Sequence, residues 1–293
     1  EDELIKLVEN ADVIIIAMGS RILKRVLEAA HKLKLVQTTG AGVDKMPPES
    51  FDYLKEKNVY LSNTSGANAI AVGEHALTLM LMLAKKAVFR HELLKQGIWE
   101  RSRSIELYQK TVGIVGLGDV GTELAKRAKA LGMRVMATKR HPSPDLAKKL
   151  GVDFLGGPDD LHKILRESDF VVLTVPTTPE TEGLIGEREL RLMKKSAFII
   201  NVARGSVIQE EALCKALKEK WIAGAGLDTW WGFVPDVPSR LGIHKLDNVV
   251  ATSHIGGSTA EFLENLTKIV SQNIERISSG QTPLNLVNLD LRY

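Results

Sequence analysis

Short apolar runs alternate with segments of helical periodicity along almost the whole chain. The apolar runs are continuous rather than alternating, which is typical of strands buried on both faces of a parallel sheet. Repeated strand–helix units predict an α/β fold with a doubly wound parallel sheet. We expect strands at residues 13–17, 35–38, 59–62, 112–115, 134–138, 170–175, 197–202, 222–227 and 249–252, and helices at residues 68–96, 120–131, 160–167, 209–219 and 258–278.

One predicted strand runs directly into a glycine-rich turn that opens a helix. Residues 112–121 read V-G-I-V-G-L-G-D-V-G. In such a turn the first glycine permits a tight bend, the second lets the backbone approach a pyrophosphate, and the third lets the helix lie close to the strand. The helix N-terminus then offers unpaired N–H groups to phosphates. We interpret the turn as a dinucleotide site, with a purely structural turn as the alternative; its residues are Gly116, Leu117, Gly118, Asp119, Val120 and Gly121.

Two boundaries divide the predicted elements into domains. The segment T-S-G-A at residues 64–67 precedes the long predicted helix, and a second boundary falls near residues 254–258. We expect residues 67–257 to form the dinucleotide-binding domain, and residues 1–66 and 258–293 to join as a smaller, discontinuous substrate domain. The chain opens within a helical segment, so we also expect a preceding N-terminal piece. Ligands of open α/β sheets bind outside the carboxyl ends of the strands, which is where we look for the site.

The amino-acid composition and net charge exclude several classes of function. The 293 residues are 44% hydrophobic, enough to fill two cores. A net charge of +3, from 39 basic and 36 acidic residues, gives no electrostatic case for nucleic acid. The longest apolar run, near residues 76–84, is too short to cross a membrane. The single cysteine, Cys214, excludes an internal disulfide and a cysteine-based zinc cluster; we expect a cytoplasmic protein and no metal.

Five segments in this order resemble the D-isomer-specific 2-hydroxyacid dehydrogenases. They are G-A-G-V-D at 40–44, N-T-S-G-A-N at 63–68 leading to Glu74 and His75, the glycine turn, N-V-A-R-G at 201–205 with G-L-D at 226–228, and H-I-G-G at 254–257. The resemblance covers nearly the whole chain except the family's first strand and helix. It implies a Rossmann nucleotide domain, a smaller flavodoxin-like α/β substrate domain that is truncated at its N-terminus, and a homodimer to which the helix near Glu74 and His75 contributes.

Two residues that follow predicted strands can carry the chemistry. Arg204 can fork onto a substrate carboxylate and polarise the adjacent carbonyl. His254 can exchange a proton with an alkoxide, because histidine titrates near neutrality. The resemblance implies these same roles. The alternatives are a surface arginine that caps a loop and a structural histidine.

The chain departs from the family at the carboxylate that orients this histidine. The family places a glutamate five residues beyond the aspartate of G-L-D, and here that position is Phe233. Three outcomes are open: Asp236 substitutes from a shifted position, another residue orients His254, or the histidine is less often protonated and turnover is slow. Trp230, Trp231 and Phe233 are bulky, and either pack between domains or select the substrate.

Further contacts follow from the resemblance. Asp228 would lie near the nicotinamide carboxamide and fix the face of the ring, with a loop-capping aspartate as the alternative. Glu74 and His75 are expected to be structural. The other expected cofactor residues are Pro176, Thr177, Thr181, Val202, Ala203, Gly256 and Gly257, and the other expected substrate residues are Gly42, Val43 and Asn68.

The strand at 134–138 ends in a basic pair. An acid about 20 residues past the glycine turn normally accepts from the ribose 2′-hydroxyl, but the chain has Lys139 and Arg140 there. Cations attract a 2′-phosphate, so we favour NADP(H) over NAD(H); an exposed basic turn is the alternative. The sequence thus indicates an NADP(H)-linked dehydrogenase of a small 2-keto or D-2-hydroxy acid. The alternatives are a catalytically weak nucleotide-binding sensor or scaffold, and a formate- or phosphite-type dehydrogenase.

Overall fold

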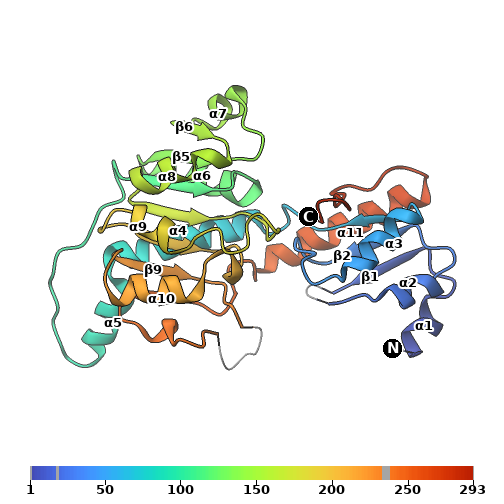
Figure 1. The fold of residues 1–293 in the computed structure, drawn as a ribbon, viewed down its shortest axis with the longest axis horizontal. Helices are drawn as coiled ribbons and strands as arrows, with labels where there is room; N and C mark the ends of the chain where they lie inside the picture. Colours follow the sequence, from blue (N-terminus) through green and yellow to red (C-terminus); the bar gives the residue numbers. More distant parts are fainter. Residues whose placement is uncertain (1, 18–19, 233–237, 293) are drawn as a thin grey trace. The chain divides into compact units, whose positions relative to one another are not determined.

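The computed structural model describes residues 2–17, 20–232 and 238–292, which fall into two compact units (Figure 1). Unit 1 comprises Glu1–Asn68 and Thr259–Tyr293, and unit 2 comprises Ala69–Ser258. No helix in the described part of the chain combines the length and the apolarity needed to cross a bilayer.

Unit 2 is built on a parallel sheet that confirms the predicted doubly wound α/β fold. Within the described residues the sheet has seven strands in the order β10-β9-β8-β7-β4-β5-β6. Every neighbouring pair is parallel, so all the carboxyl ends lie along one edge. The order reverses between β4 and β7, which creates a topological switch point. The strands are β4 (Thr111–Val115), β5 (Arg134–Thr138), β6 (Phe154–Gly156), β7 (Phe170–Leu173), β8 (Phe198–Asn201), β9 (Gly224–Leu227) and β10 (Val249–Ala251).

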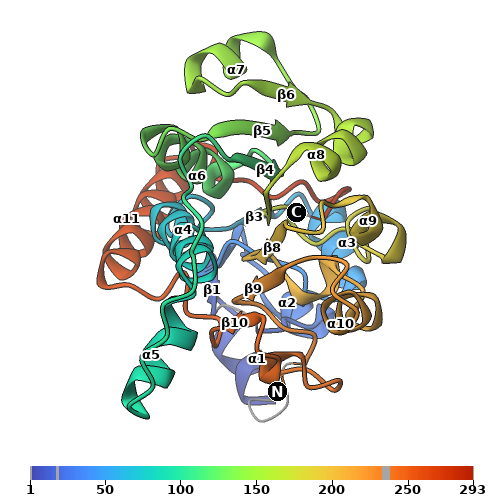
Figure 2. The ribbon, with the colours of Figure 1, turned by 90° about the vertical axis from the view of Figure 1, so that its left-hand side faces the viewer.

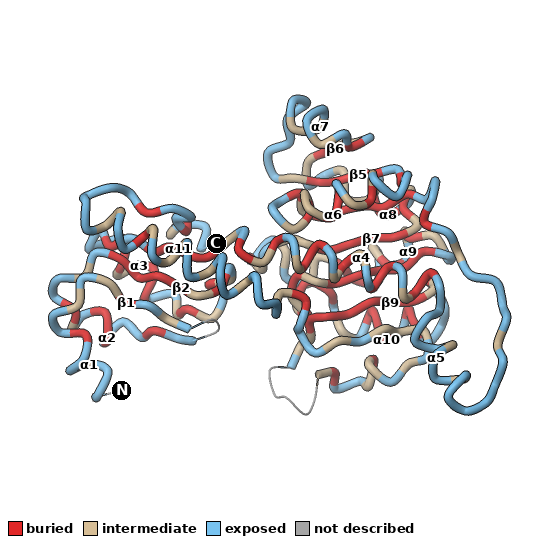
Figure 3. The backbone as a smooth tube through the Cα atoms, turned by 180° about the vertical axis from the view of Figure 1, so that it is seen from behind, coloured by how far each residue is buried: buried red, intermediate tan, exposed pale blue. Residues whose placement is uncertain are grey.

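Helices cover both faces of this sheet (Figure 2). The side chains of Phe170 and Val172 belong to one buried cluster together with residues of α4 (Ala69–Lys85) and α6 (Asp119–Ala130). Val171 and Leu173 point to the opposite cluster, with α8 (Leu161–Glu167), α9 (Glu187–Leu192) and α10 (Glu210–Lys218). Because successive side chains of a strand point to opposite faces, a continuous apolar run supplies both clusters. Figure 3 shows the resulting buried layer along the central strands.

Unit 1 has its own sheet and core. Its strands β1 (Val13–Ile16), β2 (Leu35–Thr38) and β3 (Tyr60–Ser62) are parallel and in sequence order. The helices are α1 (Asp2–Val8), α2 (Lys24–Ala29), α3 (Pro48–Glu56) and α11 (Ala260–Ser278). Asn273 of α11 is fully buried and donates to Gln37 Oε1 and Ser62 Oγ, at 2.7 and 2.9 Å. This buried polar network ties the C-terminal helix to β2 and β3.

Several element boundaries differ from the prediction. The single helix expected at 68–96 is two helices, α4 and α5 (Ala87–Lys95), because Lys86 adopts a left-handed conformation with φ of 52°. The edge strand β6 and the short helix α7 (Pro144–Leu150), like α2, α3 and α9, were not predicted from the pattern, since their apolar runs are brief. Four predicted strands, at 13–17, 170–175, 197–202 and 249–252, end one or two residues early because their last residues belong to the loops at the carboxyl ends of the strands. Short 3-10 turns complete unit 2 at Pro158–Asp160, Gly205–Val207 and Ile243–Lys245.

Candidate active site

The glycine turn after β4 shows a separate reason for each glycine. Gly116 has a φ of +103°, a conformation that side chains rarely adopt. A Cβ on Gly121 would lie 2.5 Å from the carbonyl oxygen of Gly116, so only glycine allows this approach of α6 to the turn. A Cβ on Gly118 would meet nothing within 4 Å, so the turn leaves open space over its middle glycine. This is the space that a bound pyrophosphate needs.

The surroundings of the turn also fit a dinucleotide. The N–H groups in the first turn of α6 have no carbonyl partner earlier in the helix, and they lie beside the switch point of the sheet. Thr177, in the loop that follows β7 across the switch point, has a buried hydroxyl with no hydrogen-bond partner among the described residues. A buried hydroxyl without a partner carries a desolvation cost that a ligand group can remove. The residues present therefore fit a dinucleotide.

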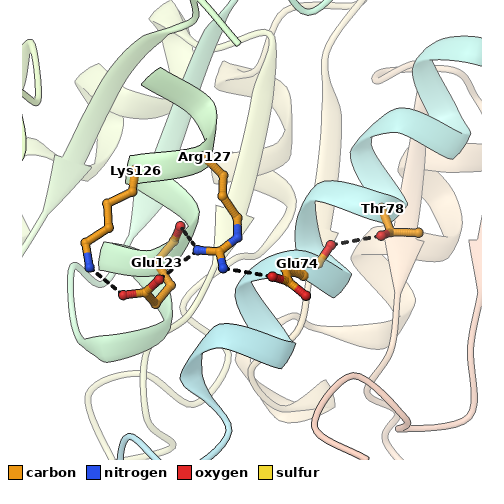
Figure 4. A network of polar contacts seen from close by, with 5 residues as sticks. All are labelled: Glu74, Thr78, Glu123, Lys126 and Arg127. Atoms are coloured by element: carbon orange, nitrogen blue, oxygen red, sulfur yellow. Dashed lines mark hydrogen bonds and ion pairs between the residues drawn. The ribbon is translucent and has the colours of Figure 1, made fainter. Parts of the chain in front are cut away.

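The helix that opens with the glycine turn is held against α4 (Figure 4). Arg127 of α6 donates to Glu74 of α4 at 2.8 Å and to Glu123 at 2.7 Å. Lys126 pairs with the same Glu123 at 2.6 Å, and these two cations hold the pKa of Glu123 below its usual value. A Cβ on Gly73 would lie 3.0 Å from Glu123 Cβ, so the two helices are in close contact. Glu74 thus joins α4 to the glycine-turn helix.

Three candidate residues follow three neighbouring strands. Arg204 lies beyond β8, Asp228 directly follows β9, and His254 lies beyond β10. Because the strands are parallel, all three residues leave the sheet at the edge that carries the glycine turn. Adjacent strands lie about 4.8 Å apart, so the ends of β8 and β10 are separated by about 10 Å. Side chains of the length of arginine and histidine can close part of this distance around a small acid.

The Arg204 loop is fixed by a residue of β8. The side chain of Asn201 accepts from the Ala203 N–H at 3.0 Å and donates to the Arg204 carbonyl at 2.8 Å. The half-buried Arg204 side chain donates from Nη1 to the Ala203 carbonyl at 2.9 Å. Asn201 is fully buried, so these contacts define how the loop turns at the edge of the sheet.

Asp228 is the centre of a buried hydrogen-bond network. Its Oδ1 accepts from the Thr252 hydroxyl at 2.6 Å and from the Ile255 N–H at 2.9 Å, and its Oδ2 accepts from the Gly256 N–H at 2.9 Å. The His75 Nε2 of α4 lies 3.4 Å from Oδ1. Burial alone would raise the pKa of this carboxyl, but the hydrogen bonds from His75, Thr252 and the two N–H groups hold it well below its usual range. Asp228 is therefore an anionic anchor for the loop after β10.

His254 immediately precedes the two anchored N–H groups. It is exposed and has a left-handed φ of 59°, which is uncommon for a side-chain-bearing residue. The ring of His75 lies behind Gly256: a Cβ at this glycine would be 2.8 Å from Asp228 Oδ2 and 3.0 Å from His75 Cδ2. Gly256 thus allows the loop to lie close to its own anchors, Asp228 and His75.

The two tryptophans after Asp228 pack within unit 2. Trp230 donates from Nε1 to the Thr252 carbonyl at 2.8 Å, and Trp231 donates to the Ile208 carbonyl at 2.6 Å. Both rings pack against the buried cluster of α8, α9 and α10. A Cβ on Gly205 would lie 2.2 Å from the Trp230 carbonyl carbon, so the Arg204 loop is in direct backbone contact with this segment. Trp230 thereby joins the loop that carries Arg204 to the loop that carries His254.

Lys139, Arg140 and the loop after β7 make hydrogen bonds and an ion pair within the protein. Lys139 donates from Nζ to the Leu117 carbonyl in the glycine turn at 2.8 Å, and Arg140 lies 3.7 Å from Glu180. The Thr181 hydroxyl donates to the Pro176 carbonyl at 2.6 Å and accepts from the Thr178 N–H at 2.8 Å. Thr181 therefore closes the loop, which leaves Thr177 as the hydroxyl in need of a partner.

The substrate residues expected from unit 1 lie in loops at the ends of its strands. Val43 is only 6% exposed and its side chain belongs to the core of unit 1, so its backbone is the part available to a ligand. The loop is held by the Asn63 side chain, which donates to the Ala41 carbonyl at 2.9 Å, while Gly42 and Asn68 are partly exposed. Phe233, which occupies the position of the family's orienting glutamate, and Asp236, its expected replacement, lie outside the described residues.

Sequence reasoning missed three contributors to the site. The sequence patterns place Asn201 only within the motif N-V-A-R-G and Thr252 only at the end of a predicted strand, and they predict a structural role for His75. A polar residue that ends a buried strand, as Asn201 does, was an available signal. The contact of His75 with Asp228 spans most of unit 2 in sequence, so only the structure reveals it. Within the described residues, no group of three or more His, Cys, Asp or Glu side chains is arranged to hold a metal ion.

Comparison with known proteins identifies the family of the chain. Residues 77–256 match a family model described as the NAD binding domain of D-isomer specific 2-hydroxyacid dehydrogenases. The chain is 37% identical over 291 residues to a D-3-phosphoglycerate dehydrogenase of Methanocaldococcus jannaschii, covering 99% of this chain and 54% of that protein. It is 36% identical over 297 residues to a glyoxylate reductase of Thermococcus litoralis, covering 98% of this chain and 87% of that one. The chain therefore spans about half the length of the first relative and most of the second.

A solved structure extends the likeness to the fold of the whole chain. An acyclic imino acid reductase, named Bsp5 and determined with NADPH and D-Arg, superposes with a TM-score of 0.84 at 28% identity, over 98% of this chain and 89% of that one. The matched family model covers the glycine turn, Arg204, Asp228 and His254 together. The chain belongs to the D-isomer specific 2-hydroxyacid dehydrogenase family, as its sequence motifs predicted.

Proposed function

We propose that the chain is a dehydrogenase that reduces a small 2-keto acid to the D-2-hydroxy acid and catalyses the reverse reaction. The observation that carries this proposal is the order of the strand ends. Arg204, Asp228 and His254 follow three neighbouring strands, at the same edge of the sheet as the glycine turn. Family membership and the names of the relatives, glyoxylate reductase and D-3-phosphoglycerate dehydrogenase, support the same reaction class.

The residues divide the work as follows. Arg204 binds the substrate carboxylate through its guanidinium fork and draws electron density from the neighbouring carbonyl. His254 gives a proton to the oxygen at C2 during reduction and takes it back during oxidation. Asp228 holds the backbone beside His254 and has capacity on Oδ2 for one further donor, such as a carboxamide. The nicotinamide, when bound, supplies or accepts the hydride at C2.

The proposed substrate contacts include residues of unit 1. Backbone N–H groups near Gly42 and Val43 and the side chain of Asn68 are proposed to bind the substrate carboxylate or its neighbouring oxygen. Asp236 is proposed as the carboxylate that orients His254, in place of the family glutamate where this chain has Phe233. If another residue orients His254, Asp236→Asn will leave the pH profile of kcat unchanged. If no residue orients His254, turnover will be slow in the wild type as well.

We also propose that NADP(H) is preferred over NAD(H). Lys139 and Arg140 follow β5, where an acid would otherwise accept from the ribose hydroxyls. Glu180 is now the partner of Arg140, so a 2′-phosphate would replace this carboxylate. The remaining cofactor contacts are proposed to come from Pro176, Thr177 and Thr181 after β7, Val202 and Ala203 after β8, and Gly256 and Gly257 after β10.

The assembly and the compartment are proposals as well. The exposed apolar side chains of Val88, Phe89 and Leu94 on α5, a helix without buried residues, support a homodimer formed through this region. Light scattering after gel filtration measures the mass of the particle directly. The single cysteine, Cys214, is buried and free, which is consistent with a cytoplasmic protein.

The experiment that tests the function is a panel of keto acids with each cofactor. Purified protein is mixed with NADPH or NADH and with glyoxylate, hydroxypyruvate, pyruvate or a larger keto acid, and absorbance at the nicotinamide band is followed. Formate and phosphite with NADP or NAD complete the panel. We expect keto-acid-dependent oxidation of NADPH. Tight nucleotide binding without turnover on any of these acids would favour a sensor instead, and turnover on formate or phosphite alone would favour that type of dehydrogenase.

A further inference from the structure

His75 of α4 contacts the anchor of the His254 loop, which is formed by Asp228 and Thr252. Its Nε2 lies 3.0 Å from the Thr252 hydroxyl oxygen and 3.4 Å from Asp228 Oδ1. The His75 side chain is 15% exposed and that of Asp228 is 3% exposed, so both groups are largely removed from water. A buried polar group that lacks its hydrogen-bond partner lowers the stability of the folded protein.

The hydrogens in this network can be assigned from the chemistry of the groups. An ionised carboxylate only accepts, so the Thr252 hydroxyl must donate to Asp228 Oδ1 across their 2.6 Å contact. The Thr252 oxygen is then an acceptor toward His75. His75 Nε2 must therefore carry a hydrogen, which it directs at the hydroxyl and the carboxylate. The histidine thus supplies the donor for the Thr252 oxygen and adds a further donor beside Asp228 Oδ1, which already accepts from Thr252 and Ile255.

The same carboxylate also fixes the backbone conformation directly after His254. Asp228 accepts from the N–H groups of Ile255 and Gly256, the two residues that follow His254. His254 itself has a left-handed φ of 59°, a conformation that persists when neighbouring contacts enforce it. The ring of His75 fills the space behind Gly256, because a Cβ there would be 3.0 Å from His75 Cδ2. The imidazole thus supports the loop by a hydrogen bond and by packing.

The helix that carries His75 is itself held in place. The preceding residue, Glu74, is paired with Arg127 of the glycine-turn helix α6 at 2.8 Å (Figure 4). Two consecutive residues of α4 therefore contact the helix of the glycine turn and the anchor of the His254 loop. A rigid helix that holds both segments fixes the backbone of one relative to the other.

We propose that His75 is a positioning residue of the redox site, which holds Asp228 and Thr252 so that they fix the backbone beside His254. This inference rests on the proposed function for its effect on turnover, but not for its effect on the loop. Without the imidazole, the carboxylate loses a donor and the loop after β10 loses its support. His254 then leaves the productive orientation for part of the time, and small misplacements of a reacting group lower turnover strongly.

The test compares His75→Ala with His75→Gln, whose amide N–H can replace the lost donor. Amide hydrogen exchange of residues 252–258, followed by mass spectrometry or NMR, reports on the loop whether or not the protein turns over substrate. We expect exchange at Ile255 and Gly256 to become about tenfold faster in His75→Ala. The kcat should fall about tenfold or more, with a much smaller change in the Kd for NADPH. His75→Gln should restore most of both.

The test includes a matched control variant, His162→Ala, and a second variant of the network, Thr252→Val. His162→Ala removes another histidine–carboxylate contact of unit 2, the 3.3 Å pair with Glu189, and should change neither quantity. Thr252→Val keeps the shape of the side chain but removes the bridging hydroxyl, and should also speed exchange at Ile255 and Gly256, even if His75→Ala does not fold. Wild-type exchange at these two amides in the His75 and Thr252 variants would overturn the proposal. A wild type without turnover would instead overturn the proposed function, while the exchange result still decides the role of His75.

Discussion

The Thr252 hydroxyl lies 2.6 Å from Asp228 Oδ1, so the end of β10 is tied to the end of β9 by a buried, charge-assisted hydrogen bond. Asp228 is only 2% exposed, and two backbone N–H groups of the following loop donate to the same carboxylate. Hydrogen bonds to a buried charge are stronger than those between neutral groups. The loop that presents His254 is therefore held by an ionised side chain.

This relationship predicts an acid-dependent loss of stability. Because the pKa of Asp228 is lowered in the folded protein, its contribution to stability is fully present above the pKa of the unfolded state, about 4, and is lost gradually as the pH falls from there through the lower pKa of the folded state. Asp228→Asn puts an amide donor opposite backbone donors, which should cost about 1–3 kcal/mol at pH 7. The difference between the wild type and Asp228→Asn should shrink below pH 4.

Urea unfolding followed by circular dichroism at several pH values between 7 and 3 measures this difference. Asp247→Asn, at an exposed aspartate of unit 2, is the matched control and should behave like the wild type. A gap between the wild type and Asp228→Asn that stays constant across this range would show that the carboxylate is not stabilised in its ionised form.

The middle glycine of the turn gives a prediction about cofactor affinity. Gly118 has a φ of −89° and open space where a Cβ would lie, so Gly118→Ala should fold normally. The added methyl occupies space that the pyrophosphate needs, and the Kd for NADPH should rise about tenfold or more. Quenching of tryptophan fluorescence on titration with NADPH gives the Kd.

Gly157→Ala is a close control, because this glycine also precedes a helical turn, has a φ of −82° and has open space at its Cβ position. It should retain both stability and affinity. An unchanged Kd for NADPH in Gly118→Ala would show that the pyrophosphate does not bind at this turn.

Much of this arrangement could be predicted from the sequence, because it depends on local patterns. The continuous apolar runs identify strands that feed two core layers, as Val171 and Val172 do on opposite faces of β7. Glycine spacing identifies the turn. Tertiary contacts could not be predicted: the apolar pattern of α4 continues through Lys86, yet a left-handed backbone ends the helix there. The pairing of His75 with Asp228 likewise depends on how α4 lies on the sheet.

The indole of Trp230 is expected to matter for turnover as well as for packing. Trp230→Phe keeps an aromatic ring but removes the donor to the Thr252 carbonyl, which lies at 2.8 Å. Loss of this hydrogen bond should cost about 1 kcal/mol of stability and lower kcat, because the His254 loop follows directly. Trp221→Phe removes an indole donor to Glu219, in a hydrogen bond that is exposed to solvent, and serves as the control. Equal kcat values in Trp230→Phe and Trp221→Phe would show that Trp230 contributes to packing and not to turnover.

Cofactor choice is expected to depend on the basic pair after β5. Lys139→Ala and Arg140→Ala should each raise the Kd for NADPH about tenfold and leave the Kd for NADH nearly unchanged, since only NADPH carries the 2′-phosphate. Lys149→Ala, on the exposed surface of α7, controls for a general loss of positive charge. Tighter binding of NADH than NADPH by the wild type would refute the preference.

The central claim is that Arg204 binds the substrate carboxylate and His254 transfers the proton, and steady-state kinetics of keto-acid reduction test it most directly. Arg204→Ala should raise the KM for the keto acid about a hundredfold, through loss of a charge-assisted fork, and His254→Gln should lower kcat about a hundredfold or more at a similar KM. Arg188→Ala, an exposed arginine on α9, should match the wild type. Wild-type kcat and KM in Arg204→Ala and His254→Gln would contradict the account.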